Sequence, residues 1–488
     1  MKRRLLLAVA ALLAAGLLWL LTTNNDAVWP VRNTLHYRLA KAWWGWAGFP
    51  QGGEGGTLAG VVRDEGGRPI AGAWVLVSRW DGETYRARTA AGGRYRIEGV
   101  PAGRYVPVAG APGYANRALG GAWRRTRIRP GAETRLDVTL ATETPPVVAP
   151  GSDLRLSERA VVTCTAPVES RAVRQTVTFD NAGQPNQPTL YYTPVTATLA
   201  APLPVLLTIY PGPADSWECA SAPLAAAGYA VIAAGPAYSL NLERDIDELE
   251  RLRQFAAGGE FPGANPERLA LLGGSYSALL VERMLERNPT GASAAVLLGP
   301  PTDLFEMRHQ LELGNFTPPF GLDRVLVALG LPDRQPMRYW QYSAAYHLPP
   351  DLPPLLLIHS RSDEVVPFAQ SQLLADNLEA AGLPYELHFF EGASHYLLSE
   401  SGEGVAIYHL TLDFLDRHLR LNASLSAPPR GENLSLWGSH SRRCNEILRS
   451  LRSLRMTSST SQTPPSPPCG GKGTGGKGGK HSDWDKKL

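Results

Sequence analysis

The pattern of apolar and polar positions changes along the chain and divides it into parts. One unbroken apolar run extends from Leu5 to Leu21. Residues 57–141 hold short β-rich runs separated by glycine and proline, whereas in residues 153–421 apolar runs of strand length alternate with helical spacing. Residues 422–488 are mostly polar. This pattern predicts a multidomain chain with an N-terminal helix, a small all-β sandwich and a larger α/β domain.

The N-terminal run is typical of a signal anchor. It follows the basic head Lys2, Arg3 and Arg4, and as a helix it would span about 25 Å, close to the thickness of a bilayer core. Because a basic head stays in the cytoplasm, the chain after residue 25 is predicted to lie outside. We expect a single-pass transmembrane helix over residues 1–25, or else a cleaved signal and a secreted protein.

Two segments are predicted to join the domains. Residues 26–56 form a juxtamembrane segment and linker, in which cations and Trp43, Trp44 and Trp46 suit a helix at the level of the lipid headgroups. A solvated stalk fits this composition equally well. The proline-rich residues 142–152 separate the β-rich part from the larger domain.

The larger domain is predicted to be built on a mostly parallel sheet, because apolar strands that alternate with helices are buried on both faces. The predicted strands are Val205 to Tyr210, Tyr229 to Ala234, Leu269 to Leu272, Ala294 to Leu298, Leu355 to His359 and Tyr385 to Phe390. Residues 302–350 are too long for a plain connection between two strands. They are apolar, and we expect either a cap that lines the substrate pocket or helices packed on the sheet.

Composition narrows the functional classes. Apolar residues make up 44% and charged residues 19%, which supplies enough material for a buried core. Residues 423–488 hold 11 Lys or Arg against 4 Asp or Glu, so the folded body is mildly acidic and no nucleic-acid partner is expected. Residues 422–488 are predicted to be a disordered basic tail.

The four cysteines form no C-x-x-C pair, so a structural zinc site is not expected. No metal or cofactor is predicted for this chain. Cys164 and Cys219 are the cysteines of the folded body. Outside the cytoplasm they could form one disulfide, although nothing in the sequence shows that they meet.

Three residues fall where an α/β architecture can use them for nucleophilic catalysis. Ser275 lies in the segment Gly-Gly-Ser-Tyr-Ser between a predicted strand and a helix, the context that a strained nucleophile turn requires. Asp363 and His395 each follow a later strand, in the chain order that α/β-hydrolases use. Glu364 and Asp303 are the rivals of Asp363 for the role of the acid.

These segments resemble the catalytic domain of the S9 (prolyl oligopeptidase-like) serine peptidases, within the α/β-hydrolases. The resemblance is carried by Asn265 to Tyr276, Pro354 to Pro367 and His388 to His395. It implies hydrolysis through an acyl-enzyme on Ser275. The chain departs from the usual pattern at Ser277, where glycine is common, and it has a sandwich in place of the family's β-propeller, so ester substrates remain open.

Stabilisation of the oxyanion needs two hydrogen-bond donors. The backbone N–H of Tyr276, directly after the nucleophile, is the first expected donor. The second is expected from the turn after the Val205–Tyr210 strand, where Gly212 is the only residue of 211–213 with an N–H. The Tyr210 hydroxyl is the alternative, because some enzymes similar to the S9 peptidases use a tyrosine there.

The β-rich part resembles a carboxypeptidase regulatory-like domain, a transthyretin-like sandwich. The matching segments are Gly60 to Asp64, Gly67 to Ala73, Gly93 to Tyr95, Val100 to Tyr105 and Gly113 to Tyr114. The resemblance implies no catalysis and a role as a spacer or as a unit that contacts polysaccharide or the cell envelope.

Taken together, these patterns predict a membrane-anchored serine hydrolase that acts outside the cytoplasm and cleaves peptide bonds. Its expected partners are a small peptide or ester substrate and the membrane. Two alternatives remain: a carboxylesterase of the dienelactone-hydrolase or acyl-esterase type, and an inactive adhesion or envelope protein.

Overall fold

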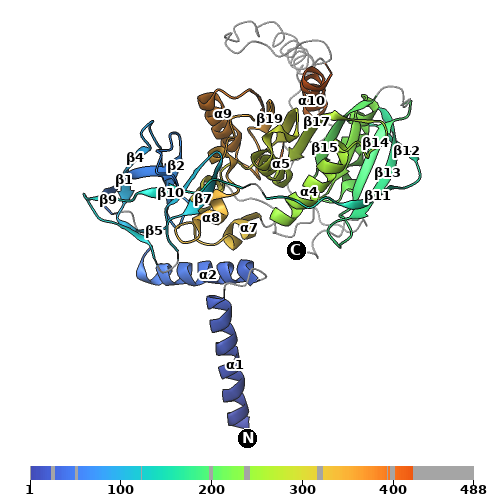
Figure 1. Ribbon diagram of the computed structural model, residues 1–488. Coiled ribbons are helices and arrows are strands. Elements are labelled where there is room, and N and C mark those ends of the chain that lie inside the picture. Colours follow the sequence, from blue (N-terminus) through green and yellow to red (C-terminus); the bar gives the residue numbers. More distant parts are fainter. Residues whose placement is uncertain are drawn as a thin grey trace, which may run out of the picture. The chain divides into compact units, whose positions relative to one another are not determined.

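The computed structural model of the protein describes residues 2–23, 28–49, 53–121, 124–144, 146–196, 202–235, 242–315, 322–392, 394–395 and 402–420. The expected tail, residues 422–488, lies outside these ranges. The described ranges contain two N-terminal helices, a β-sandwich and an α/β domain (Figure 1).

The first helix, α1 (Lys2–Thr22), covers the apolar run, and α2 (Trp29–Ala47) covers most of the expected juxtamembrane segment. Within the described ranges, no helix combines the length and the apolar character that crossing a membrane requires. The transmembrane part of the predicted fold is therefore not supported.

The sandwich consists mainly of two sheets that enclose one apolar core. One sheet has the strand order β10-β1-β4, with β9 also paired to β1, and the other has the order β3-β2-β6-β7. Leu58 and Val62 from β1 and Val75 and Val77 from β2 are buried in the core between them. The expected all-β domain is thus confirmed. The strand bounds are β1 (Gly55–Asp64), β2 (Trp74–Ser78), β3 (Thr84–Arg88), β4 (Arg94–Pro101), β6 (Val108–Ala111), β7 (Tyr114–Ala118), β9 (Glu133–Arg135) and β10 (Val138–Leu140).

A ten-stranded sheet forms the centre of the α/β domain, with the order β11-β13-β14-β16-β15-β17-β18-β19-β20 and β12 paired to β13. From β16 to β20 all neighbours are parallel, as predicted. The bounds are β11 (Ser152–Leu156), β12 (Ala160–Cys164), β13 (Ser170–Asp180), β14 (Thr189–Pro194), β15 (Leu203–Ile209), β16 (Ala230–Ala234), β17 (Ala264–Gly274), β18 (Ala294–Leu298), β19 (Leu355–Ser360) and β20 (Tyr385–Phe390).

The first four strands of this sheet were not among the predicted strands. β11 to β14 are joined without helices and pair antiparallel, and β14 joins them to the parallel part through β16. Strand β13 is polar at many positions because several of its residues face solvent. A search for apolar runs alternating with helices therefore misses it.

Helices cover both faces of the sheet (Figure 1). Alternate residues of β15 belong to two separate cores, Leu207 to one and Leu206 to the other. The first core includes α4 (Leu242–Ala257), α5 (Tyr276–Arg287) and α9 (Ala369–Ala381), and the second includes α3 (Glu218–Ala226) and α10 (Gly402–Leu419). This alternation confirms the predicted double-sided burial.

The long insert contains α6 (Leu304–Leu313), α7 (Leu322–Ala328) and α8 (Pro336–Trp340). Buried Trp340 stacks on Tyr346 and donates its indole N–H to Asn116 of the sandwich at 2.9 Å. Leu76 and Val108 of the sandwich are buried in the same core as these aromatic residues. The insert thus packs between the sheet and the sandwich; its expected role as a cap over substrate stays a prediction. Phe316 and Phe320, two of its apolar residues, lie outside the described ranges.

Candidate active site

Ser275 occupies a sharp turn between β17 and α5. Its φ of 54° and ψ of −127° are unusual for a residue with a side chain and indicate local strain. The turn brings the helix close to the strand, because a Cβ added to Gly273 would lie 2.5 Å from the Ser277 carbonyl oxygen. The serine therefore presents its hydroxyl at the carboxyl end of the parallel strands, as a nucleophile turn does.

Ser275, His395 and Asp363 form a hydrogen-bonded row. The Oγ of Ser275 lies 2.8 Å from Nε2 of His395, and Nδ1 of His395 lies 2.7 Å from Oδ2 of Asp363. A carboxylate can only accept, so Nδ1 donates, and in the neutral imidazole Nε2 then accepts from the serine hydroxyl. The three residues are 120 and 32 positions apart in sequence, and the fold brings their side chains together.

Asp363 is held ionised by its surroundings. Its Oδ1 accepts the backbone N–H groups of Val365 and Val366 at 2.8 and 2.7 Å. Burial raises the pKa of this carboxyl, but hydrogen bonds from His359 and His395 outweigh burial and lower the pKa well below its usual range. Asp363 is therefore a carboxylate throughout the ordinary pH range and can orient His395.

His359, the last residue of the predicted strand Leu355 to His359, contacts the carboxylate of Asp363. Its side chain is fully buried, and its Nε2 lies 2.9 Å from the Val366 carbonyl oxygen and 3.3 Å from Oδ2 of Asp363. Because both partners are acceptors, Nε2 carries the proton, and Nδ1 accepts from the Ser371 hydroxyl at 2.7 Å. His359 thus supports Asp363 at Oδ2, the same oxygen that His395 contacts.

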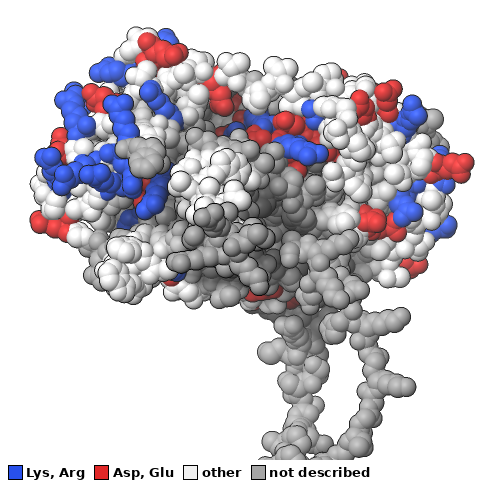
Figure 2. Space-filling model, turned by 90° about the horizontal axis from the view of Figure 1, so that it is seen from below, with Lys and Arg blue, Asp and Glu red and all other residues white. Residues whose placement is uncertain are grey.

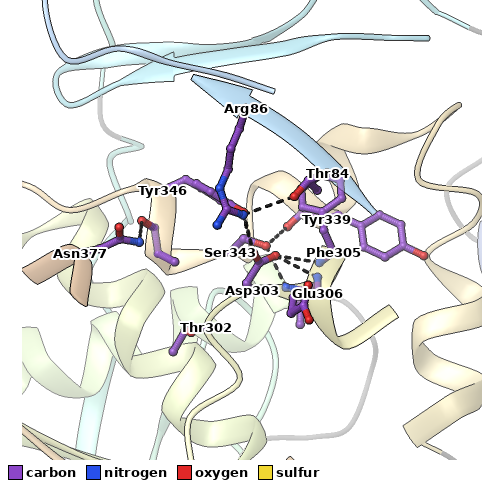
Figure 3. A network of polar contacts seen from close by, with 12 residues as sticks. Thr84, Arg86, Thr302, Asp303, Phe305, Glu306, Tyr339, Ser343, Tyr346 and Asn377 are labelled. Carbon is purple, nitrogen blue, oxygen red and sulfur yellow. Dashed lines mark hydrogen bonds and ion pairs between the residues drawn. The ribbon is translucent and has the colours of Figure 1, made fainter. Parts of the chain in front are cut away.

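Neither rival carboxylate takes the place of Asp363. Asp303 is buried at the start of α6, where it caps the helix by accepting from the N–H groups of Phe305 and Glu306 (Figure 3). Its other oxygen accepts from the Tyr346 hydroxyl at 2.5 Å, beside Arg86 of the sandwich. Glu364 contacts His395 through the backbone N–H at 3.2 Å, away from the imidazole.

Gly299 is a site residue that the sequence analysis missed. It follows β18 with a φ of 54°, and a Cβ there would lie 3.3 Å from Oδ2 of Asp363 and 3.7 Å from Cε1 of His395. Only glycine combines this backbone conformation with such a close approach. The signal available in the sequence was a glycine directly after a strand, in Leu298-Gly299-Pro300, which is common in turns and therefore weak.

The expected oxyanion donors come from two turns. Tyr276 is the first residue of α5, directly after Ser275. The Gly212 N–H donates to the Tyr210 carbonyl oxygen at 2.9 Å. The Tyr210 hydroxyl is buried against Ser221 Oγ at 2.8 Å, with its ring stacked on Trp217. These are the partners of Gly212 and Tyr210 in the structure, and the second oxyanion donor stays a prediction.

A small hollow lies between Thr189, Gly235, Asp245 and Glu248. The Tyr276 hydroxyl donates to Asp245 at 3.1 Å, so the residue after Ser275 contacts one of the side chains that line it. A second small hollow lies among leucine side chains between α5 and the insert. In the described part of the chain, no member of the triad lines either hollow.

Comparison with protein families agrees with both halves of the fold. Residues 57–141 match the carboxypeptidase regulatory-like domain, and residues 247–422 match the prolyl oligopeptidase family. The second match includes Ser275, Asp363 and His395. No curated protein matches the chain.

Several solved structures are similar at low identity. Esterase B from Lactobacillus rhamnosis is 18% identical, with a TM-score of 0.41 over 51% of this chain and 86% of that chain. Dipeptidyl peptidase 4 from Porphyromonas gingivalis is 14% identical, with a TM-score of 0.39 over 72% of this chain and 49% of that chain. A truncated carbohydrate esterase from gut microbiota is 20% identical, with a TM-score of 0.40 over 47% of this chain and 90% of that chain. These similarities are too low to assign an activity.

Proposed function

We propose that this serine hydrolase, whose catalytic part matches the prolyl oligopeptidase family over residues 247–422, cleaves amide bonds of small peptides through an acyl-enzyme. The observation that carries the acyl-enzyme mechanism is the continuous row from the Ser275 hydroxyl through His395 to Asp363, and the match to the prolyl oligopeptidase family favours an amide as the bond cleaved. In such a row the serine is the nucleophile, the histidine is the general base and the carboxylate orients the histidine.

The reaction begins when His395 Nε2 removes the proton of Ser275 as its Oγ attacks the carbonyl carbon. The imidazolium that forms is stabilised by ionised Asp363. His395 then gives the proton to the leaving amine, which leaves an acyl group on Ser275. A water molecule, activated by the same imidazole, attacks the acyl carbon and releases the acid, and the serine regains its proton.

Charge on the substrate oxygen develops in both steps and needs a donor. The Tyr276 backbone N–H is the first donor in this proposal, because it follows the nucleophile at the start of α5 and the helix dipole there favours negative charge. Loss of one such donor costs about 3 kcal/mol in the barrier.

The direct test is Ser275→Ala. We expect the variant to lose all labelling by a fluorophosphonate probe and all turnover, because it lacks the hydroxyl that lies 2.8 Å from His395 Nε2. Ser277→Ala is the matched control: it removes a hydroxyl two residues away that is buried and has no hydrogen-bond partner among the described residues. It should label and turn over as the unmodified protein does. Labelling of the Ser275→Ala variant would contradict the assignment.

Peptide and ester substrates are separated by a second experiment. Turnover of aminoacyl-nitroanilides is compared with turnover of short-chain nitrophenyl esters, both normalised to the fraction of Ser275 that the probe labels. A peptidase should cleave the anilides at a rate comparable to the rate at which it cleaves the esters. Ester turnover with no anilide cleavage by the fully labelled enzyme would favour the carboxylesterase alternative.

We also propose that the enzyme acts outside the cytoplasm, held at a membrane by its N-terminal segment. The basic head before Leu5 to Leu21 supports this location, and so does the disulfide between Cys164 and Cys219, a bond that persists in oxidising compartments. The test is alkylation of intact cells, followed by mass analysis with and without reduction. Alkylation of Cys164 and Cys219 themselves without reduction, identified in their own peptides and separately from Cys444 and Cys469, would contradict the location.

A further inference from the structure

Helix α2 has one face docked on the protein through polar contacts. Asn33 is fully buried and donates to the Ala328 carbonyl oxygen at 3.0 Å and to Gln335 Oε1 at 3.0 Å. One turn further on, Tyr37 donates to Glu312 at 2.7 Å, and Lys41 pairs with the same carboxylate at 2.9 Å. These contacts with the insert fix the rotation of the helix about its axis.

The opposite face of α2 is apolar and exposed. Four large side chains stand on it, with exposed fractions of 59% for Val31, 50% for Leu39, 60% for Trp43 and 80% for Trp46. At 3.6 residues per turn these positions fall within a sector of about 120°. The rotation that the buried face imposes therefore forces two indoles and two aliphatic side chains into solvent, which is unfavourable unless another surface covers them.

A row of arginines lies on the sandwich. Residues 57–141 contain 14 Arg and no Lys against 7 Asp or Glu. In the two-stranded ribbon of β5 (Gly103–Tyr105) and β8 (Thr126–Ile128), Arg104 lies directly opposite Arg127, and Arg129 follows on the same side. All three are exposed, and no ion pair joins their side chains to another residue of the described ranges. Like charges in opposite positions are destabilising, so this arrangement calls for an anionic partner.

The arginine row extends to the neighbourhood of α2. Arg125, two positions before Arg127, lies 3.9 Å from Asp333, which is also 3.9 Å from Arg334. His36 of α2 is close enough to Arg334 that, after burial, the charges of Arg32 and Arg334 lower its pKa. Figure 2 shows basic side chains gathered on the face seen from below, which is the side on which α2 lies in Figure 1.

We propose that the exposed face of α2 and the arginine row Arg104, Arg127 and Arg129 form one surface that lies on an anionic phospholipid bilayer. Indole rings prefer the boundary between headgroups and acyl chains, and arginine binds lipid phosphates with paired hydrogen bonds. The apolar face of α2 would thus contact the boundary with the acyl chains, and the arginine row would contact the headgroup phosphates. A protein partner would not require apolar and basic side chains to be separated in this way. The proposal does not depend on the catalytic assignment.

The test uses the full chain in lipid vesicles that carry bromine near the headgroups, which quenches nearby indoles. The signal of interest is the part of the tryptophan quenching that disappears in the double variant Trp43→Phe/Trp46→Phe. Phenylalanine keeps the face apolar, so the variant removes only the two indoles. Trp19→Phe serves as the control for the indole of α1. We expect this signal in vesicles containing phosphatidylglycerol, and a weaker one in pure phosphatidylcholine.

The arginine contribution is measured with Arg104→Gln/Arg127→Gln/Arg129→Gln. The ratio of docked to undocked protein on phosphatidylglycerol vesicles should fall roughly fivefold for each arginine removed, and added salt should weaken docking of the unmodified protein. The matched control is Arg63→Gln/Arg68→Gln/Arg96→Gln, which removes the same charge from other exposed positions of the sandwich and should change docking little. Equal melting temperatures establish that all variants fold.

Two results would overturn the proposal. The first is equal quenching of the unmodified protein and the Trp43/Trp46 variant, which would place the indoles away from lipid; crosslinking of two copies through this face would then identify a dimer interface. The second is docking that is equally strong on phosphatidylglycerol and on phosphatidylcholine, and equally strong in the two triple arginine variants.

Discussion

At the residue scale, the site depends on backbone conformations that few residues adopt. Ser275 and Gly299 both have a φ of 54°. They directly follow β17 and β18, which are neighbours in the sheet. For Ser275 this strain, typically about 1–3 kcal/mol, exposes the hydroxyl to His395. For Gly299 it lets the backbone pass beside Asp363. The surrounding sheet holds both conformations.

Gly299→Ala is therefore expected to reduce activity. The added Cβ, 3.3 Å from Oδ2 of Asp363, should displace the Asp363–His395 pair, and kcat should fall about tenfold or more, since small misplacements of catalytic groups are costly. Gly382→Ala is the control, with a similar φ of 68° and no atom within 4 Å of its Cβ. It should lower the melting temperature but leave kcat unchanged. Equal effects of the two substitutions on kcat would contradict this role of Gly299.

At the scale of elements, β20 and α10 flank the segment that carries His395. Glu386 of β20 and Arg417 of α10 form a two-pronged ion pair, with N–O distances of 2.5 and 2.9 Å. Burial raises the pKa of Glu386, but hydrogen bonds from His388 and Arg417 outweigh it and lower the pKa to about 2. The ion pair thus joins β20 to α10, the two elements between which the chain carries His395.

Glu386→Gln should lower the free energy of unfolding by about 1.5–3 kcal/mol at neutral pH, the range for hydrogen bonds to charged groups. A carboxyl with a depressed folded pKa stabilises the fold above its unfolded value of 4.5, and this contribution is lost as pH falls through about 2. Denaturant unfolding of both proteins, from neutral pH downwards, should show the difference shrinking over that window. A difference that is constant with pH would exclude the charge as its source.

At the scale of the whole molecule, the sandwich and the catalytic domain share buried contacts. Arg86 of β3 donates to the Tyr346 hydroxyl at 2.6 Å, and Tyr346 donates to buried Asp303 (Figure 3). Burial raises the pKa of Asp303, while Tyr346 and Arg86 act against this rise. Asp303 begins the insert shortly after Gly299, so the sandwich braces a segment that adjoins the site.

Arg86→Ala should destabilise the protein by about 1–3 kcal/mol, because buried Asp303 and Tyr346 lose a charged partner. Arg94→Ala, at an exposed position of the same sandwich, is the matched control and should change stability by less than about 0.5 kcal/mol. Thermal unfolding followed by calorimetry measures both. Equal shifts in the two variants would mean that the contact with Asp303 contributes nothing.

Much of the α/β domain and the triad could be predicted because the signals are local. Apolar strands such as Leu355 to His359 have few alternative structures, and Ser275, Asp363 and His395 each lie one to five residues beyond the end of a strand. The carboxyl ends of parallel strands meet at one edge of a sheet, so the order of the strands alone brings such residues near one another. Strands β11 to β14 escaped prediction because their half-exposed residues lack this apolar signal.

The sequence by itself determined the strands of the parallel part of the sheet, the two domain types and the three residues that we propose as the catalytic row. Only the tertiary structure decided what depends on distance between segments remote in the chain: the support of Asp363 by His359, the close approach of Gly299, the commitment of Tyr210 to Ser221, and the face that α2 leaves exposed. The reason is physical. Periodicity and turn chemistry act over a few residues, whereas hydrogen bonds and burial depend on which surfaces meet once the chain has packed.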